Sequence, residues 1–254
     1  MRSFEDIYNE LWNREKFINV SRFKHTVDLL PPISDQTIVS DIASGKGYFA
    51  DYLTNNSNIT RDQLTCYDIS PLAIDDLARN QFKNNLLDIE TGCVEPVADI
   101  VFFLEAIEHV LEPDRVLQNL YRSLKPGGYL IISTPNYAKI NRRIRMLLGF
   151  IPEKYTSGNH HISMFSVWFL KKRLLANGFV IDKENNLFEM ESLGRVFKRW
   201  LKPHIPYLKK KFPLDNFNYI PATVLPNLMA DLVLIRARKP LNSLADTNKY
   251  NPLS

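Results

Sequence analysis

From Ile38 onward, the sequence alternates short apolar runs with stretches of helical periodicity. The apolar runs are IVSDIAS, LTCYDIS, NNLLDI, ADIVFFLE, GYLIIST, FVIDKENNLF and DLVLIRAR, and helical patterns such as PLAIDDLARNQF stand between several of them. Strands that alternate with helices are typical of parallel βαβ units. ADIVFFL and YLIIS are apolar throughout, which indicates central strands covered on both faces. The pattern predicts an α/β fold with a doubly wound sheet.

The rest of the chain falls outside this alternation. Residues 1–32 have the pattern of amphipathic helices closed by a Pro-Pro step, and we expect them to form a helical lid. Residues 189–230, rich in proline, lysine and aromatics, form an insertion before the last strand. The tail 241–254 is polar and without periodicity, which predicts disorder. We therefore expect a single domain over residues 1–240.

Composition narrows the class of protein. The chain has 254 residues, 45% of them hydrophobic and 24% charged, which is enough to bury a core of its own. It contains no apolar run of about 18 residues that would span a bilayer, and acids stand near the N-terminus where a signal peptide needs an apolar core. We therefore expect a cytoplasmic protein. Cys66 and Cys93 are too few for a disulfide scaffold and are expected to be apolar fillers.

Charge is unevenly divided along the chain. Residues 1–136 carry 12 Lys+Arg against 20 Asp+Glu, a net charge of −8, whereas residues 137–240 carry 19 against 7, a net charge of +12. The acidic half favours a ligand with cationic character. The basic half favours an anionic substrate, a phosphate-bearing polymer or a lipid surface.

A glycine-rich turn follows the first strand pattern. The stretch GKGYFA (residues 45–50) fits the fingerprint G-x-G-x-x-A, and Asp68 follows about 20 residues later. Such a strand, turn and helix start let a ligand approach the backbone, where free N–H groups hold anionic atoms. Nicotinamide and flavin dinucleotides share this scheme, so a nucleotide-dependent oxidoreductase and an ordinary tight turn both stay open at this point.

The glycine turn is one of several motifs that follow one another along the chain. DIASGKGYFADYL, CYDISPLAIDDLA, DIVFFLEAIEHVLEPDRVLQNLYRSLKPGGYLIISTPNY and HHISMFSVWFLKKRLLANGFVI resemble class I S-adenosylmethionine (SAM)-dependent methyltransferases in order and spacing, over residues 38–182. The resemblance implies a Rossmann-like, doubly wound seven-stranded sheet with N-terminal helices and an insertion before the last strand. It also implies SAM as the cofactor, and the cationic sulfonium of SAM suits the acidic half.

The resemblance also assigns cofactor-binding residues. It places the methionine end of SAM against Asp41 and the glycine turn, and the ribose against Asp68. Ala43 departs from the family, which usually has a glycine there; if the position needs a positive φ, alanine costs about 1 kcal/mol. The residues expected to bind the cofactor are Asp41, Ala43, Gly45, Gly47, Asp68, Asp88 and Leu104.

The stretch FFLEAIEHV contains a candidate metal site. Glu105, Glu108 and His109 stand at i, i+3 and i+4, so they would share one face if a helix begins directly after the strand. A fourth candidate is His161, or its neighbour His160, which follows the next strand and the TPN turn and is expected at the same edge of the sheet.

This combination resembles two subgroups of methyltransferases. They are the ubiquinone-biosynthesis O-methyltransferases and the metal-dependent enzymes that modify the 2′-hydroxyl at small-RNA 3′ ends. The resemblance implies Mg²⁺ or another divalent cation held by Glu105, Glu108, His109 and His161. Such an ion would lower the pKa of an acceptor hydroxyl. In the alternative the turn is metal-free and His161 or His109 is the general base; the candidate catalytic residues are His161, His109 and Glu105.

The insertion contains a strongly basic segment. Residues 195–211 (RVFKRWLKPHIPYLKKK) hold seven Lys+Arg and no acid, interleaved with aromatic and aliphatic residues. Peripheral contact with an anionic membrane, binding of nucleic acid, and a solvated basic face are the three interpretations. We expect a helix near the substrate entrance to carry Arg142, Arg143 and Arg145, which would add to the positive electrostatic potential of the basic segment.

The sequence thus predicts a SAM-dependent methyltransferase, with O-methylation of a small or lipid-linked acceptor, such as a quinone precursor or a glycan, as the leading hypothesis. RNA or other nucleic-acid 2′-O-methylation ranks below it. A non-catalytic scaffold that keeps the cofactor fold is a further alternative. The oxidoreductase is disfavoured, because the chain lacks a Tyr-x-x-x-Lys pair at the expected place.

Overall fold

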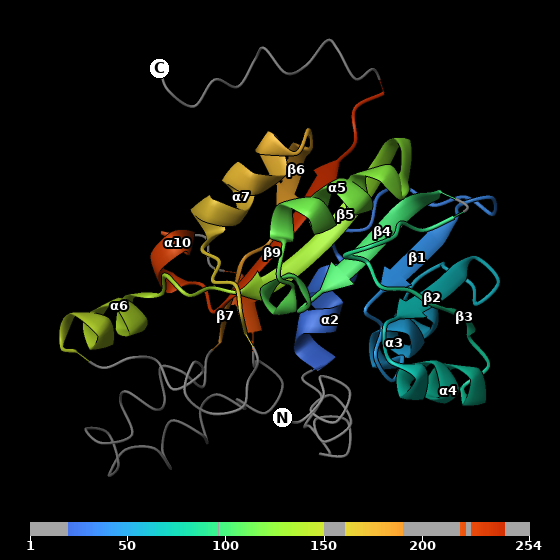
Figure 1. Cartoon of the computed structure of the whole chain (residues 1–254), viewed down its shortest axis with the longest axis horizontal. Helices are drawn as coiled ribbons and strands as arrows, with labels where there is room; N and C mark the ends of the chain where they lie inside the picture. Colours follow the sequence, from blue (N-terminus) through green and yellow to red (C-terminus); the bar gives the residue numbers. More distant parts are fainter. Residues whose placement is uncertain (1–19, 96, 150–160, 190–218, 222–224, 242–254) are drawn as a thin grey trace, which may run out of the picture.

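The computed structural model describes residues 20–95, 97–149, 161–189, 219–221 and 225–241 (Figure 1). The first part of the expected lid, His160, the basic segment of the insertion and the expected disordered tail from residue 242 onward lie outside these ranges. In the described part of the chain, no helix combines the length and apolar character needed to cross a membrane.

One mixed sheet organises the described residues. Its strands are β1 (Val39–Ile42), β2 (Leu64–Asp68), β3 (Lys83–Leu86), β4 (Ala98–Leu104), β5 (Leu124–Pro135), β6 (Val180–Glu184), β7 (Leu187–Glu189), β8 (Tyr219–Pro221) and β9 (Leu232–Arg238). The order is β3-β2-β1-β4-β5-β9-β7-β8, and β6 also pairs with β9. Strands β1 to β5 are parallel, whereas β9 runs antiparallel to β5 and to β6.

Strands β6 and β7 lie along the same edge of β9. Val180 pairs with Arg238 at one end of β9, and Leu187 pairs with Leu232 at the other. Counted as one interrupted strand, β6 and β7 complete a sheet of seven positions, to which β8 adds a short extension. The predicted doubly wound, seven-stranded α/β fold is therefore confirmed.

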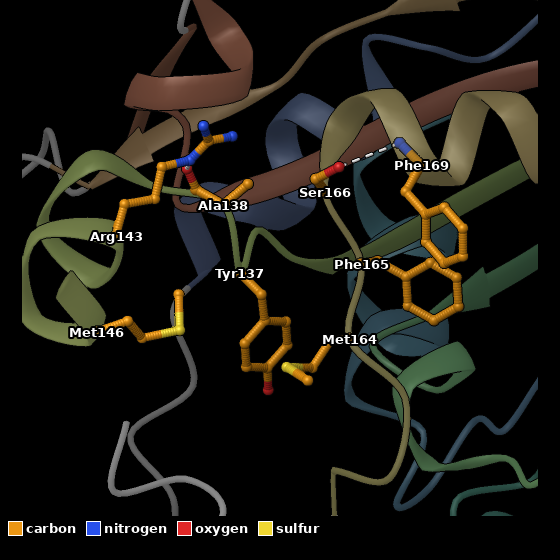
Figure 2. Close-up of a pocket in the computed structure, with 8 residues that line it drawn as sticks. All are labelled: Tyr137, Ala138, Arg143, Met146, Met164, Phe165, Ser166 and Phe169. Atoms are coloured by element: carbon orange, nitrogen blue, oxygen red, sulfur yellow. Dashed lines mark hydrogen bonds between the residues drawn. The ribbon is translucent and has the colours of Figure 1, made fainter. Parts of the chain in front are cut away.

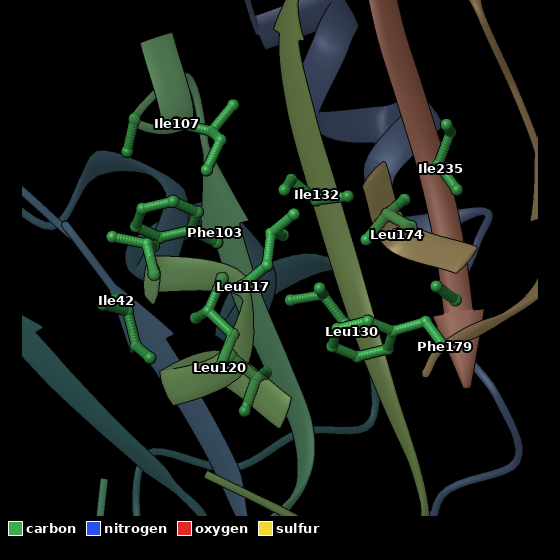
Figure 3. Close-up of a cluster of buried hydrophobic side chains, with 14 of the residues drawn as sticks. Ile42, Phe103, Ile107, Leu117, Leu120, Leu130, Ile132, Leu174, Phe179 and Ile235 are labelled. Carbon is green, nitrogen blue, oxygen red and sulfur yellow. The ribbon is translucent and has the colours of Figure 1, made fainter. Parts of the chain in front are cut away.

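Helices cover both faces of this sheet (Figure 1). The helical elements among the described residues are α2 (Val20–Val27), α3 (Tyr48–Asn56), α4 (Pro71–Arg79), the 3₁₀ turn η1 (Ile107–His109), α5 (Pro113–Arg122), α6 (Ile140–Leu147), α7 (Val167–Ala176) and α10 (Pro226–Met229). Of these, α6 has no buried residue and projects away from the sheet. Because side chains alternate along a strand, Phe103 joins the core beneath α5 and α7 (Figure 3), while Phe102 joins the core beneath α3 and α4.

The predicted N-terminal helical region is represented by α2. Its Phe23 packs edge-on against Phe49 of α3, with ring centroids 5.3 Å apart. The carbonyl oxygen of Leu29, just after the helix, accepts a hydrogen bond of 2.7 Å from Arg236 of β9. Helix α2 therefore packs on the α3 side of the sheet and is tied to its antiparallel part.

Candidate active site

The glycine turn joins β1 to α3 through three residues of positive φ. Ala43, Gly45 and Gly47 have φ values of 60°, 56° and 80°. A Cβ atom on Gly47 would lie 2.8 Å from a methyl carbon of Leu77, so helix packing as well as backbone conformation requires glycine there. The sequence left open whether the position of Ala43 needs a positive φ. It does, because Ala43 has the left-handed conformation.

Asp68, at the end of β2, is fixed by this turn. Its carboxylate accepts hydrogen bonds from the Gly45 and Ser70 amides, each 2.9 Å long. From the sequence, the Gly45 amide was expected to be one of the free donors that bind an anionic ligand. Instead, it donates a hydrogen bond to the carboxylate of Asp68. Burial raises the pKa of Asp68, although these backbone hydrogen bonds act in the opposite direction.

Asp41, at the centre of the site, is 2% exposed. Among the described residues, its Oδ2 atom has no hydrogen-bond partner. Burial, with the nearby negative charge of Asp68 as a smaller cause, raises the pKa of Asp41 to about 7. A buried carboxylate oxygen without a donor is costly. The site therefore favours a ligand that brings a cationic or hydrogen-bonding group to Asp41.

The last two predicted cofactor residues lie at the same edge of the sheet. Asp88 follows β3, and its Oδ1 accepts a 2.9 Å hydrogen bond from the Glu90 amide. Leu104 is the half-buried last residue of β4. Since β1 to β4 are parallel, their carboxyl ends bring Asp41, Asp68 and these residues to one edge of the sheet, which is the edge where ligands bind in open α/β sheets.

Glu105 departs from the predicted helical face. It has a φ of 52°, and η1 begins two residues later, so Glu105 does not share a helix face with Glu108 and His109. Its Oε1 accepts a 2.9 Å hydrogen bond from Ser133, and its Oε2 lies 3.9 Å from a guanidinium nitrogen of Arg22 in α2. The prediction of a common face was wrong because a left-handed residue turns the chain between strand and helix.

Glu108, His109 and His161 do come together. One potential ligand atom from each lies within 4.8 Å of the others. Glu108 is 1% exposed, and its Oε2 accepts a 3.0 Å hydrogen bond from Thr134 of β5. The rings of His109 and His161 meet edge-on, with centroids 4.7 Å apart. Three of the four predicted metal-ligating residues therefore form one group, and Glu105 lies outside it.

Backbone contacts hold His161 in this group although it is distant in sequence. The amides of Ile162 and Ser163 donate to the carbonyl oxygen of Glu108 at 2.8 and 3.0 Å. Next to this anchor, the Tyr137 hydroxyl is hydrogen-bonded to Nδ1 of His161. Tyr137 was not among the residues predicted from the sequence; its position directly after the TPN turn at the end of β5 is the signal that was available.

An open pocket of about 470 Å³ adjoins this group (Figure 2). Its lining is apolar apart from hydroxyls and one guanidinium, and consists of Tyr137, Ala138, Arg143, Met146, Met164, Phe165, Ser166 and Phe169. Arg143 and Met146 come from α6, whereas Ser166 caps α7 through the Phe169 amide. Except for Arg143, these residues were not predicted from the sequence, because three separate segments contribute them.

Comparison with known proteins decides the family. A family profile described as "Methyltransferase domain" matches residues 15–184, which include the glycine turn, both buried acids and the Glu108–His109–His161 group. The chain belongs to this methyltransferase family. It is accordingly a SAM-dependent methyltransferase, as the sequence predicted.

A curated relative is similar to this methyltransferase over much of its length. The "Ubiquinone biosynthesis O-methyltransferase" of Rickettsia bellii (strain OSU 85-389) is 31% identical over 173 residues, which are 62% of this chain and 69% of the relative.

Solved structures share the fold at lower identity. A SAM-dependent methyltransferase from Thermotoga maritima has a TM-score of 0.59 and 20% identity, covering 93% of this chain and 97% of the other. A phosphoethanolamine N-methyltransferase from Haemonchus contortus, solved with SAM, has a TM-score of 0.59 and 16% identity, covering 94% of this chain and 60% of the other.

Proposed function

We propose that this methyltransferase methylates a hydroxyl oxygen of a small or lipid-linked acceptor that carries an apolar portion, such as a quinone precursor. The observation that carries the proposal is the Glu108–His109–His161 group beside an apolar pocket. This arrangement offers proton-accepting and cation-binding atoms next to a surface for an apolar body. The name of the Rickettsia relative supports an O-methyltransferase.

The residues of the glycine turn fit SAM. SAM, when bound, supplies an electrophilic methyl group on a cationic sulfur. The Oδ2 of Asp41, which has no hydrogen-bond partner in the described part of the chain, suits the ammonium of its methionine part, and the fixed carboxylate of Asp68 suits the ribose hydroxyls. The proposed cofactor-binding residues are Asp41, Ala43, Gly45, Gly47, Asp68, Asp88 and Leu104.

The group at η1 fits a divalent cation. Glu108 offers a carboxylate held in place by Thr134, and His109 and His161 offer imidazoles. Imidazole and carboxylate together suit a first-row transition metal better than Mg²⁺, which prefers oxygen ligands. We choose Mn²⁺ as the probe ion, because it is a transition metal that also binds carboxylates well. A divalent cation, when bound, lowers the pKa of an acceptor hydroxyl.

Proton transfer is the contribution of the histidines. A hydroxyl is a poor methyl acceptor until it loses its proton, and an imidazole of His161 or His109 takes up that proton without a metal. Glu108, buried beside them, stabilises the resulting imidazolium. Glu105, bound to Ser133, acts on the cofactor side of the site instead.

The pocket and α6 support an acceptor with a lipid part. Met146, Met164 and Phe169 offer apolar contact in the pocket. On α6, no residue is buried, Leu147 is 87% exposed, and the helix carries three arginines and no acid. We propose that this helix meets an anionic membrane surface in which such an acceptor resides.

The test combines binding with turnover. Calorimetric titration with S-adenosylhomocysteine (SAH), with and without Mn²⁺, precedes assays with methyl-labelled SAM and a catechol, a polyprenylated phenol and a short RNA. We expect SAH binding, a separate Mn²⁺ isotherm and methylation of the phenols. Methylation of RNA alone would support the nucleic-acid alternative, and SAH binding without any turnover would support a scaffold.

Substitution of Glu108 tests the metal group. We expect Glu108→Gln to weaken Mn²⁺ binding at least about tenfold, since it removes a charged ligand, and to leave SAH binding unchanged. Glu112→Gln is the matched control, because Glu112 is an exposed acid at the start of α5. Equal Mn²⁺ binding by both variants would show that Glu108 has only a structural role.

A further inference from the structure

Tyr137 connects the two parts of the proposed site. It stands two residues after the end of β5 and is 6% exposed. Its ring is one wall of the apolar pocket, as Figure 2 shows, while its hydroxyl is hydrogen-bonded to Nδ1 of His161. A single side chain thus touches both the space for the acceptor and the histidine beside Glu108.

The surrounding structure fixes the position of Tyr137. Its amide donates a 2.7 Å hydrogen bond to the carbonyl oxygen of Phe165, where a parallel bridge joins Asn136 to Phe165. The guanidinium of Arg142 lies over the Tyr137 ring, 4.8 Å from its centroid, and donates a 2.7 Å hydrogen bond to the Asn136 carbonyl. The Tyr137 ring stands almost perpendicular to that of His161, at 87°.

The contact at Nδ1 matters because a neutral histidine has two tautomers. If Nδ1 carries the proton and donates to Tyr137, Nε2 keeps its lone pair and can bind a cation or accept a proton. If Nε2 carries the proton, that lone pair is lost. A second hydrogen bond to the ring therefore decides which nitrogen is chemically available.

We propose that Tyr137 is a positioning residue that accepts the Nδ1 proton of His161 in a hydrogen bond and so holds His161 in the Nδ1–H tautomer, in which Nε2 carries the lone pair. Because the same ring lines the pocket, Tyr137 also sets the acceptor's place relative to His161. The role that this inference gives to Nε2 rests on the proposed function. The tautomer itself is measurable without any acceptor.

The test is ¹⁵N NMR of the histidine side chains in the metal-free protein at a pH where His161 is neutral, with the signals assigned from His161→Gln. We expect the Nδ1–H tautomer in the wild type and a shift towards Nε2–H in Tyr137→Phe, which keeps the ring. Mn²⁺ affinity should fall about tenfold or more, while SAH affinity stays unchanged. Tyr121→Phe, at a tyrosine that packs on Phe179, is the matched control.

Two outcomes would overturn the proposal. One is an Nε2–H tautomer in the wild type, a measurement that needs no substitution of Tyr137. The other is a Tyr137→Phe protein with unaltered tautomer and Mn²⁺ affinity. For an acceptor that is turned over, we expect Tyr137→Phe to lower kcat more than it raises KM. If no acceptor is turned over, the proposed function fails, whereas the NMR and Mn²⁺ data still decide the role of Tyr137.

Discussion

At the scale of single residues, Asp41 shows how burial prepares a carboxyl group for a cationic ligand. Its carboxyl group is buried without a donor to Oδ2 among the described residues, and burial raises its pKa to about 7. A carboxylate in this state binds a cationic group more strongly than an exposed one would, because electrostatic attraction is stronger in a buried site of low dielectric constant.

The raised pKa of Asp41 predicts pH dependence. Because the folded state binds this proton more tightly than the unfolded chain, the contribution of Asp41 to the free energy of unfolding is largest below about pH 4 and is lost as pH rises to about 7. SAH, whose ammonium needs the ionised form, should bind more weakly as pH falls below about 7, by up to about tenfold per unit. Titrations across this range check this, and Asp41→Asn should remove the dependence; a persisting slope would assign it to another group.

Ala43 allows a prediction about strain. Its φ of 60° is costly for a residue with a Cβ atom, so Ala43→Gly should raise the free energy of unfolding by about 1 kcal/mol, as measured in urea. Gly149→Ala is the reverse control: Gly149 has a φ of +83°, and a Cβ atom added there would have nothing within 4 Å, so strain alone should destabilise this variant. A neutral Ala43→Gly would mean that the turn relaxes around alanine.

At the scale of elements, α6 is a helix with several exposed apolar side chains. Ile144, Leu147 and Leu148, in or just after the helix, are 51%, 87% and 66% exposed. In water, the apolar surface of these side chains stays exposed. At a membrane, the same side chains would bury this surface beside the three arginines.

Vesicle binding tests α6. We expect Ile144→Ser combined with Leu147→Ser to weaken binding to phosphatidylglycerol vesicles at least about tenfold, because two apolar anchors are lost. The free energy of unfolding should change by less than about 0.5 kcal/mol, since both residues are exposed. Leu86→Ser, at an exposed leucine of β3, is the control. Equal vesicle binding by both proteins would exclude α6 as the contact.

At the scale of the whole molecule, the acidic half and the basic half of the sequence supply different parts of the structure. The acidic half supplies β1 to β5 and the proposed cofactor-binding residues, whereas the basic half begins at Tyr137 and supplies α6 and all the residues that line the pocket. In the proposed function, the acceptor therefore approaches from the basic side, and the cationic methyl donor binds on the acidic side.

Local sequence determined most of the fold and the place of the candidate cofactor residues. Apolar runs alternating with helical patterns predict parallel strands, and residues at the carboxyl ends of such strands must meet at one edge. Asp68 was predicted from its spacing after the glycine fingerprint, whereas Asp41 and Ala43 came from the resemblance to the methyltransferase family. These features depend on neighbours within a few residues and on the periodicity of one chain.

Only the tertiary structure decided the rest of the site. The left-handed conformation of Glu105 separates it from Glu108, which a helical spacing cannot reveal. His161 reaches Glu108, and Tyr137 reaches His161, through hydrogen bonds between segments distant in sequence. Such contacts depend on how strand ends and loops pack in three dimensions, so sequence periodicity determines the sheet, while packing determines which side chains meet on it.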